Sequence, residues 1–563
     1  MISFKCNGKL YKDQWLIIAV MSIVMVLGIS WGLPNKQRIE LLSGGSTPEK
    51  DEIFLMNSLS GRYSYGSEVT EGWNGWESEA GARTGSYIYY LISSSAQDEF
   101  NLYKSFSNIN PAKLDFDPKF YHYGGAYLYP VAAILYLFKS INIFYPTLDF
   151  TYYYHNPSHI RNMFISGRML TLSAFVGTLI LLGLFGNIFD GRVAGTLSML
   201  TYSFSTLVLN QSLVSKPHIY AAFWAFLAVY QAVLYIKHQK TKFIIISAIA
   251  SGLAIGSSQL SIPIAIIYPI MLFDRFRIKQ TIKYILLTWI VVVTVFFLTN
   301  PFILLNFNTY KSSMGQNTSI FSLSAYNSVL YLKNIFIKAH VFPATIIGFF
   351  LLFSSFSKND NLLKKLTCIT SILLFIVALG FSGTYLRWSL FLSPLICLLS
   401  GIGINRLIFQ SSGLNKFVKG CLVVLIFSPG VFFTMLFARD VIFDAKWYEP
   451  TVEWIKSGPI DSKTTIGIFG TRVYPVSFPP FPFIKGKLVD IQENLDEQDL
   501  PDYVLISLFK KEKFLGQWNQ HRFRSNYHLA YNLGDRPSYW WFSNIRTKSL
   551  SRISAFVYQL NDF

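Results

Sequence analysis

Long apolar runs separated by short polar segments dominate most of the chain, and they determine the elements that we expect there. A helix crosses the hydrocarbon core of a bilayer with about 20 mainly apolar residues. Runs near this length predict about 11 spanning helices and an all-α membrane module over residues 1–437. The predicted spans are residues 15–33, 164–189, 193–209, 218–236, 243–257, 260–273, 282–299, 341–356, 367–381, 386–404 and 418–437.

Residues 121–145 (YHYGGAYLYPVAAILYLFKSINIFY) are also apolar enough to span, and the distribution of basic residues decides their placement. If this segment does not cross, the basic loops at 237–242, 275–279, 358–365 and 406–416 share the side of the basic N-terminal tail. The positive-inside rule then places all of them in the cytoplasm. We therefore predict a helix in the membrane plane, where its tyrosine-rich flanks suit the interface.

This topology puts three regions on the outer face of the membrane: a large first loop (34–163), a shorter loop (300–340) and the C-terminal region (438–563). In the C-terminal region, TIGIFG, KLVDI, YVLISLF and AFVYQL are typical of short strands, and residues 447–457 are typical of a helix. We expect a small α/β domain there, which either binds an acceptor or caps the membrane module.

Composition and charge support a membrane protein. Hydrophobic residues make up 52% of the chain and charged residues 14%, against about 25% charged in a typical soluble domain. This excludes a purely soluble enzyme and a disordered chain. The net charge of +18 lies mostly in short loops, which indicates membrane orientation and no nucleic-acid partner. The four cysteines form no CxxC pair, so neither a disulfide framework nor a cysteine metal site is indicated.

An acidic pair, Asp51 and Glu52, follows the first predicted span at a short distance. Acidic residues at the start of a helix are often partners of the helix dipole. A carboxylate is also ionised at pH 7 and can accept a proton from a hydroxyl as a general base. Both interpretations stay open on local grounds.

Several stretches, taken in order with this acidic pair, resemble the GT-C superfamily of integral-membrane glycosyltransferases. The similarity is greatest to the branch of protein O-mannosyltransferases and lipid A aminoarabinose transferases. The stretches are PKFYHYGGAYLYP (118–130), GRMLTLSAFVGTLILLGLFGNIFDGRVAG (167–195), NPFILLNFNTY (300–310), YLRWSLFLSPLICLLSGIGI (385–404) and FARDVIFDAKWYEPTVEWI (437–455).

The resemblance implies a GT-C-type bundle with in-plane juxtamembrane helices in the first outer loop. It also implies transfer of a single sugar from a polyprenyl-phosphate donor to an acceptor hydroxyl, with Asp51 as base and Glu52 in support. The acceptor is a glycan, a lipid or a protein, and the implied location is a bacterial inner or plasma membrane with an extracytoplasmic active site.

The stretch SLVSKPHIYAAFW (212–224) departs from the family pattern, because His218 stands where the family commonly has an aspartate. With Lys216, His218 is a candidate to bind the donor phosphate, although a lone histidine is often structural. Two basic groups in place of a carboxylate weaken the case for a metal mechanism. No cofactor is therefore expected to be required, and the question of a divalent metal stays open.

Two arginines near predicted span ends, Arg387 and Arg168, are further candidates for the donor phosphate. A guanidinium fork matches phosphate oxygens in two places. The alternative is a side chain that snorkels to the membrane surface. The resemblance favours phosphate binding for Arg387.

Aromatic residues are the candidates for sugar contact. Trp73 and Trp76 lie in the first outer loop, and the pair 540–541 (WW) lies in the C-terminal region. Their indoles can stack on a sugar or anchor at the membrane surface. His122 and Tyr123, at the front of the in-plane segment, are candidates to face the substrate.

Three other classes of protein are compatible with many spans. A polysaccharide polymerase or ligase also uses lipid-linked sugars, a transporter or flippase would move them without forming a bond, and a membrane scaffold would tolerate replacement of Asp51. The expected partners are a polyprenyl-phosphate sugar, an acceptor and membrane lipids.

Overall fold

The computed structural model of the 563-residue chain describes residues 9–43, 92–94, 96–147, 149–273, 278–318, 325–341, 343–354, 360–380, 386–410, 413, 415–442, 463–469, 487–491, 501–507, 527–533 and 555–560. The chain forms two compact units. The first unit contains Met1–Trp31, Phe120–Tyr136 and Ile165–Phe443, and the second contains Gly32–Lys119, Leu137–Phe164 and Asp444–Phe563. The predicted division at residue 437 stays a prediction.

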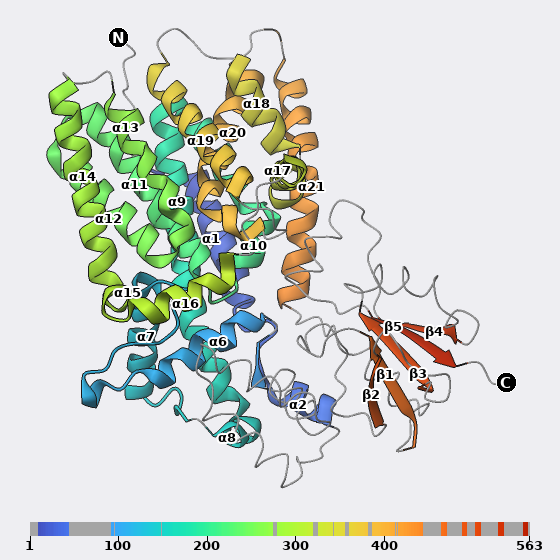
Figure 1. Cartoon of the computed structure of the whole chain (residues 1–563). Coiled ribbons are helices and arrows are strands. Elements are labelled where there is room, and N and C mark those ends of the chain that lie inside the picture. The colour runs from blue at the N-terminus through green and yellow to red at the C-terminus, as the bar shows by residue number, and fades with distance from the viewer. Residues whose placement is uncertain are drawn as a thin grey trace. The chain divides into compact units, whose positions relative to one another are not determined.

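Helices dominate the described residues (Figure 1). In chain order the helical elements are α1 (Lys12–Leu27), α2 (Lys36–Ser43), α6 (Gln97–Ser105), η3 (Phe106–Asn108), η4 (Pro111–Lys113), α7 (Gly125–Ser140), α8 (Phe150–His155), α9 (Pro157–Ser203), α10 (Thr206–Ser212), α11 (Pro217–His238), α12 (Thr241–Ser257), η5 (Gln259–Ile266), α13 (Ile267–Leu272), α14 (Ile278–Thr299), α15 (Pro301–Leu305), α16 (Phe307–Thr318), α17 (Ala325–Asn334), η6 (Ile335–Ala339), α18 (Ala344–Ser354), α19 (Asn361–Gly380), η7 (Leu386–Leu392), α20 (Ser393–Ile404), η8 (Asn405–Phe409) and α21 (Lys416–Ile442).

Among the described residues, six helical segments are long and apolar enough to cross a membrane. They are Pro157–Ser203, Pro217–His238, Ile278–Thr299, Asn361–Leu379, Leu386–Phe409 and Lys416–Arg439. The third of these is α14, and only 17% of its most apolar 18-residue stretch is buried within the protein. Its exposed leucine, isoleucine and valine side chains therefore require lipid. The chain is an integral membrane protein.

Several predicted spans form shorter or broken elements. The backbone of α9 leaves helical geometry at Asp190 and Gly191, where Gly191 has a φ of 81°, between the predicted spans 164–189 and 193–209. The predicted span 260–273 consists of η5 and α13, and 341–356 contains only the 11 residues of α18. The count of about 11 spans therefore stays a prediction.

Within the first unit, α12 packs between α11 and α14, and these helices lie side by side in Figure 1. Helix α1 runs antiparallel to the first part of α9. Residues near the start of α1 bond to Asn187 and Arg192, whereas a residue that follows α1 bonds to Arg168.

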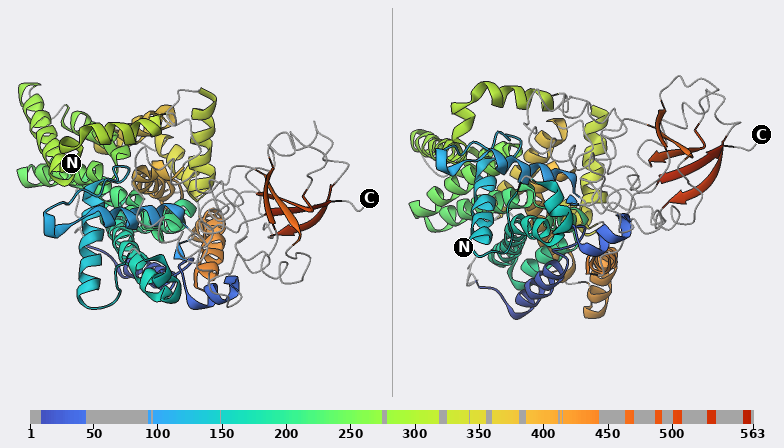
Figure 2. Two further views of the ribbon diagram at one scale, coloured as in Figure 1. Left: turned by 60° about the horizontal axis from the view of Figure 1, so that its bottom comes forward. Right: turned by 90° about the horizontal axis from the view of Figure 1, so that it is seen from below.

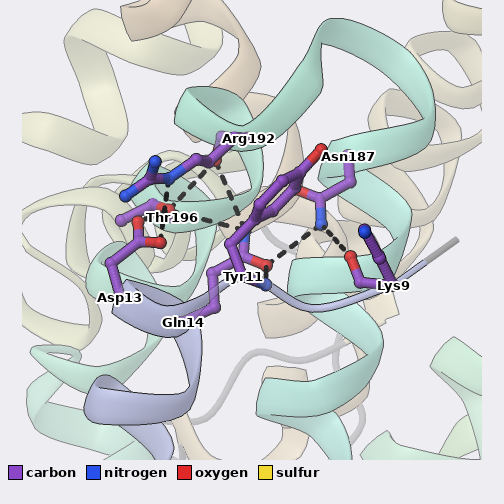
Figure 3. A network of polar contacts seen from close by, with 7 residues as sticks. All are labelled: Lys9, Tyr11, Asp13, Gln14, Asn187, Arg192 and Thr196. Carbon is purple, nitrogen blue, oxygen red and sulfur yellow. Dashed lines mark hydrogen bonds and ion pairs between the residues drawn. The ribbon is translucent and has the colours of Figure 1, made fainter. Parts of the chain in front are cut away.

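Polar contacts join the start of α1 to the kink of α9 (Figure 3). Asp13 accepts from Arg192 Nε at 2.9 Å and from the Thr196 hydroxyl at 2.8 Å. The amides of Gln14 and Asn187 bond to each other in both directions, at 2.8 and 3.0 Å. Gln14 is fully buried, so these bonds satisfy polar atoms that would be costly to leave unpaired.

Arg406, from the π-helical segment η8, forms an ion pair with Asp190 at the α9 kink. It contacts Asp190 with Nε and Asp360 with Nη1, both at 2.6 Å. The three side chains are 12%, 8% and 10% exposed, so this ion network is largely withdrawn from water. The network holds the α9 kink, the approach to α19 and the end of α20 together.

In the second unit, five strands form one sheet (Figure 2). They are β1 (Thr465–Phe469), β2 (Lys487–Ile491), β3 (Tyr503–Ser507), β4 (Tyr527–Leu533) and β5 (Ala555–Leu560), in the order β2-β1-β3-β5-β4. The neighbours β2, β1 and β3 are parallel, while β5 pairs antiparallel with β3 and β4.

Four of these strands lie in the stretches that predicted them, and β4 was not predicted. Its sequence, YHLAYNL, alternates large apolar side chains with smaller or polar ones, which is the signal of a strand with two different faces. The helix expected at 447–457 lies outside the described residues, so the α/β character of this domain stays a prediction.

Candidate functional site

The predicted site residues divide into those that the structure describes and those that it does not. Asp51, Glu52, Trp73, Trp76 and the tryptophan pair 540–541 lie outside the described residues. The six others, Arg168, Lys216, His218, His122, Tyr123 and Arg387, all belong to the first unit.

Two glycines dock the front of α7 on the ends of two neighbouring helices. Gly124 N–H donates to the carbonyl of Ser257, the last residue of α12, at 3.0 Å. Gly125 N–H donates to Oδ1 of Asn300, directly after α14, at 2.7 Å. A Cβ on Gly124 would overlap the carbonyl oxygen of Gly256, so only glycine allows this close approach. The GG of the predicted in-plane segment is therefore a docking point.

This docking holds His122 and Tyr123 just ahead of α7. The ring of Phe120 meets both of them edge-on, at centroid distances of 5.6 and 5.1 Å. On the far side, Tyr123 presents its ring to His218 at 6.5 Å. Two residues predicted to face the substrate and one predicted to bind the donor thus lie together, although almost 100 residues separate them in sequence.

Tyr310, from α16, packs against the residue that precedes this pair. Its ring meets that of Tyr121 at 6.1 Å, and its hydroxyl donates to Gln259 at 3.0 Å. Burial raises the pKa of Tyr310, although the bond to Gln259 acts in the opposite direction. The hydroxyl therefore stays protonated at neutral pH.

The start of α11 carries Lys216 as its N-cap, then Pro217 and His218. Proline at the first helical position is favourable because its missing N–H is not needed there, and it keeps the preceding residue extended, as Lys216 is (φ −137°, ψ 152°). Lys216 and His218 are only 6% and 8% exposed. Two basic side chains thus lie in a largely buried position at the positive end of a helix dipole.

This arrangement suits an anion. A lysine ammonium has no acceptor atom, so the N-cap side chain does not bind the N–H groups of the first turn. An approaching phosphate can accept from those N–H groups and from the nearby cations. The start of α11 therefore has the electrostatic properties of a phosphate site.

A tyrosine that the sequence analysis did not select supports this turn. The Tyr127 hydroxyl is 3.1 Å from Ser215 Oγ, next to Lys216, and 3.4 Å from Thr171 Oγ1 on α9. Tyr127 is 0% exposed. A tyrosine within an apolar helix is the sequence signal for such a contact. A buried hydroxyl is costly unless it is hydrogen-bonded, so it indicates a polar partner nearby.

Arg168 lies inside α9, which begins at Pro157, and is 1% exposed. Its Nη1 donates to the carbonyls of Ile29 and Trp31, at 2.9 and 2.7 Å. These bonds tie α9 to the residues that follow α1. Its predicted role at the donor phosphate stays a prediction.

Arg387 belongs to η7, a 3₁₀ segment that precedes α20. This segment packs against α10 and α11. Arg387 is partly buried, while residues 389–392 are buried. The structure therefore brings the segment of Arg387 beside the helix that begins at Lys216 and His218.

Within the described ranges, no group of three or more histidine, cysteine, aspartate or glutamate side chains is placed to hold a metal ion. The predicted acidic pair lies outside those ranges, so the question of whether the protein binds a divalent metal stays open.

Comparison with known proteins gives similarity in structure alone. No family model matches the chain, and a search of curated proteins finds no match. The chain is similar to the crystal structure of ArnT from Cupriavidus metallidurans bound to undecaprenyl phosphate, with 9% identity over 97% of this chain and 98% of that one, at a TM-score of 0.44.

It is also similar to the oligosaccharyltransferase of Archaeoglobus fulgidus. The apo form has 12% identity over 83% of this chain and 70% of that one, at a TM-score of 0.45. The protein, AglB, in complex with an inhibitory peptide and a dolichol-phosphate has 10% identity over 90% and 70%, at 0.42.

Proposed function

We propose that the chain is a glycosyltransferase that moves a single sugar from a polyprenyl-phosphate donor to an acceptor hydroxyl at the outer face of the membrane. The observation that carries the proposal is the start of α11, where Lys216 and His218 are buried at a helix N-terminus beside Tyr123, on a helix that packs against the segment of Arg387. Buried basic side chains at a helix N-terminus of a membrane protein support a binding site for a lipid phosphate.

The donor phosphate binds at the start of α11. Lys216 and protonated His218 supply positive charge, and the Arg387 guanidinium bonds to two phosphate oxygens. The prenyl chain extends along the apolar outer surface of the helices. His122 and Tyr123 contact the substrate, and Trp73 and Trp76 stack on the sugar.

Transfer follows as a displacement at the anomeric carbon. Asp51, supported by Glu52, removes the proton of the acceptor hydroxyl, and the oxygen attacks the anomeric carbon with inversion. The bond from that carbon to the phosphate oxygen breaks, and its electron pair leaves with the lipid phosphate. Arg387 and Lys216 stabilise the charge that develops on the leaving group, an effect worth about 10²–10³ in rate for one preorganised donor.

The test is direct. Purified protein is incubated with a panel of polyprenyl-phosphate sugars and acceptors, and released lipid phosphate and glycosylated acceptor are measured. We expect release with at least one donor, one sugar per acceptor, and a strong loss in Lys216→Met. The matched control is Lys240→Met, because Lys240 is also a helix N-cap, on α12, and is exposed.

Three outcomes contradict the proposal. Extended sugar chains would indicate a polymerase, and movement of lipid-linked sugar across vesicles without a new bond would indicate a transporter. Equal activity of the Lys216 and Lys240 variants would remove the start of α11 from the site.

A further inference from the structure

Two irregular helical segments, η6 and η7, pack against each other. The π-helical η6 packs on the 3₁₀ segment η7, which carries Arg387. His340 follows η6 and is 2% exposed. Its Nδ1 is 2.9 Å from the carbonyl of Ile335, and its Nε2 is 3.0 Å from Oγ of Ser393, directly after η7.

The partners of His340 define its hydrogen-bonding state. A carbonyl oxygen only accepts, so Nδ1 carries the proton and donates to Ile335. In the neutral ring Nε2 is then an acceptor, and the Ser393 hydroxyl donates to it. His340 thus links η6 to the end of η7 in a defined tautomer.

A second bond reaches the middle of η7 from α17. Tyr331 is 2% exposed and its hydroxyl bonds with Ser389. Ser389 Oγ already donates to the carbonyl of Leu386 at 2.7 Å, so the Tyr331 hydroxyl is the donor to Ser389. Tyr331 therefore holds the middle of η7, and His340 holds the residue directly after it, both on the C-terminal side of Arg387.

Tyr331 and His340 together form a clasp on η7, and the bundle anchors this clasp next to His340. The hydroxyl groups of Ser205 and Thr206 donate to the carbonyl of Ala339, at 2.8 and 3.2 Å, next to His340. These residues lie at the start of α10, which also packs against η7. The position of η6 is thus fixed from the bundle.

From this geometry we propose that Tyr331 and His340 are positioning residues for Arg387: they keep η7 in 3₁₀ geometry so that the guanidinium faces the start of α11. The inference rests on the proposed function. A 3₁₀ turn has poorer hydrogen-bond geometry than an α turn and needs outside support. Side chains advance about 120° per residue in a 3₁₀ helix and about 100° in an α-helix.

Loss of the bonds from Tyr331 and His340 would change the direction in which Arg387 points. If η7 relaxed to α-helical geometry from Ser393 backwards, the direction of Arg387 would turn by about 20° at each residue, or about 120° over the segment. The guanidinium would then face away from its present direction.

A double-mutant cycle tests the proposal. Binding of undecaprenyl phosphate to the full-length protein in detergent is measured for Tyr331→Phe and His340→Asn, each with Arg387 present and with Arg387→Ala. We expect each single variant to bind about tenfold more weakly, in line with the effect of small misplacements. In the Arg387→Ala background we expect the same changes to have almost no further effect.

The controls separate positioning from folding. Tyr268→Phe removes another fully buried hydroxyl, which bonds with Ser247 and Ser251, and it should leave affinity unchanged. His340→Gln keeps an amide oxygen within reach of Ser393 and should restore most of the affinity.

Each result has a defined meaning. If the loss of affinity from Tyr331→Phe or His340→Asn adds in full to the loss from Arg387→Ala, the positioning role is overturned. An independent structural defect would be additive in that way. A His340→Gln variant as weak as His340→Asn overturns the role of the Ser393 bond. If the wild-type protein binds no lipid phosphate, the proposed function fails first and the inference fails with it.

Discussion

Substitution of Gly124 by alanine tests whether the docking of α7 builds the site. The added Cβ would overlap the carbonyl oxygen of Gly256, which is a backbone atom that cannot swing aside as a side-chain end can. Overpacking of this kind costs about 1–3 kcal/mol, and more where the obstacle is rigid.

The same substitution pulls apart two hydrogen bonds. The bond from Gly124 N–H to Ser257 measures 3.0 Å, and the bond from Gly125 N–H to Asn300 measures 2.7 Å. Each contributes about 1 kcal/mol net. Adding these to the steric cost gives a destabilisation of about 3–5 kcal/mol at this contact.

The front of α7 can relieve this strain by lifting from α12 and α14. Tyr123 would then lose its contact with His218, and the donor site would open. We expect Gly124→Ala to lower the thermal unfolding temperature in detergent and to weaken binding of undecaprenyl phosphate at least about tenfold.

Gly420→Ala, on α21, is the matched control. A Cβ there meets no described heavy atom within 4 Å, so affinity should not change, and stability should be equal or slightly higher. If Gly124→Ala unfolds and binds like the wild-type protein, the close docking of α7 is refuted.

Four further predictions concern single side chains. Arg387→Ala should weaken undecaprenyl phosphate binding by about 10- to 100-fold, the value of a charge-assisted hydrogen bond of about 1.5–3 kcal/mol, and unchanged affinity would remove Arg387 from the site. Asp51→Asn should lower turnover by about 10²–10⁴ with folding and donor affinity intact, and retained turnover would refute Asp51 as the base. Arg406→Met should destabilise the protein by about 3–5 kcal/mol, because Asp190 and Asp360 would lose their buried partner; an unchanged unfolding temperature would show that the network contributes nothing. Burial lowers the pKa of His340 to about 4, against the bond to Ile335, which acts in the opposite direction. The unfolded chain therefore takes up this proton first as the pH falls, so stability should decline by about 3 kcal/mol from pH 6.5 to about 4; a His340→Asn variant with the same acid dependence would contradict this.

Patterns of neighbouring residues in the sequence predicted the helices and strands whose formation depends mainly on those residues. The apolar run at 121–145 predicted a helix, and α7 lies within it. Its placement in the membrane plane stays a prediction. The polar residues near 190 predicted a break between apolar runs, and the backbone turns at Asp190 and Gly191. Four strands of the sheet followed from short apolar runs bounded by turn residues.

Other features depend on packing between distant segments, which a single sequence does not reveal. An apolar run has no signal that distinguishes the 3₁₀ geometry of η7 from an α-helix, because the clasp from Tyr331 and His340 supports it from another part of the chain. Arg168 is a similar case. Its charge suggested a phosphate partner, while the carbonyls that it contacts belong to residues that follow α1.

The most direct test of the central claim is a cryo-EM structure of the full-length protein with bound undecaprenyl phosphate. The account predicts headgroup density at the start of α11, within about 3.2 Å of Lys216 Nζ and facing the segment of Arg387. An ordered headgroup at the opposite end of the bundle, near Asp190 and Arg406, would contradict it.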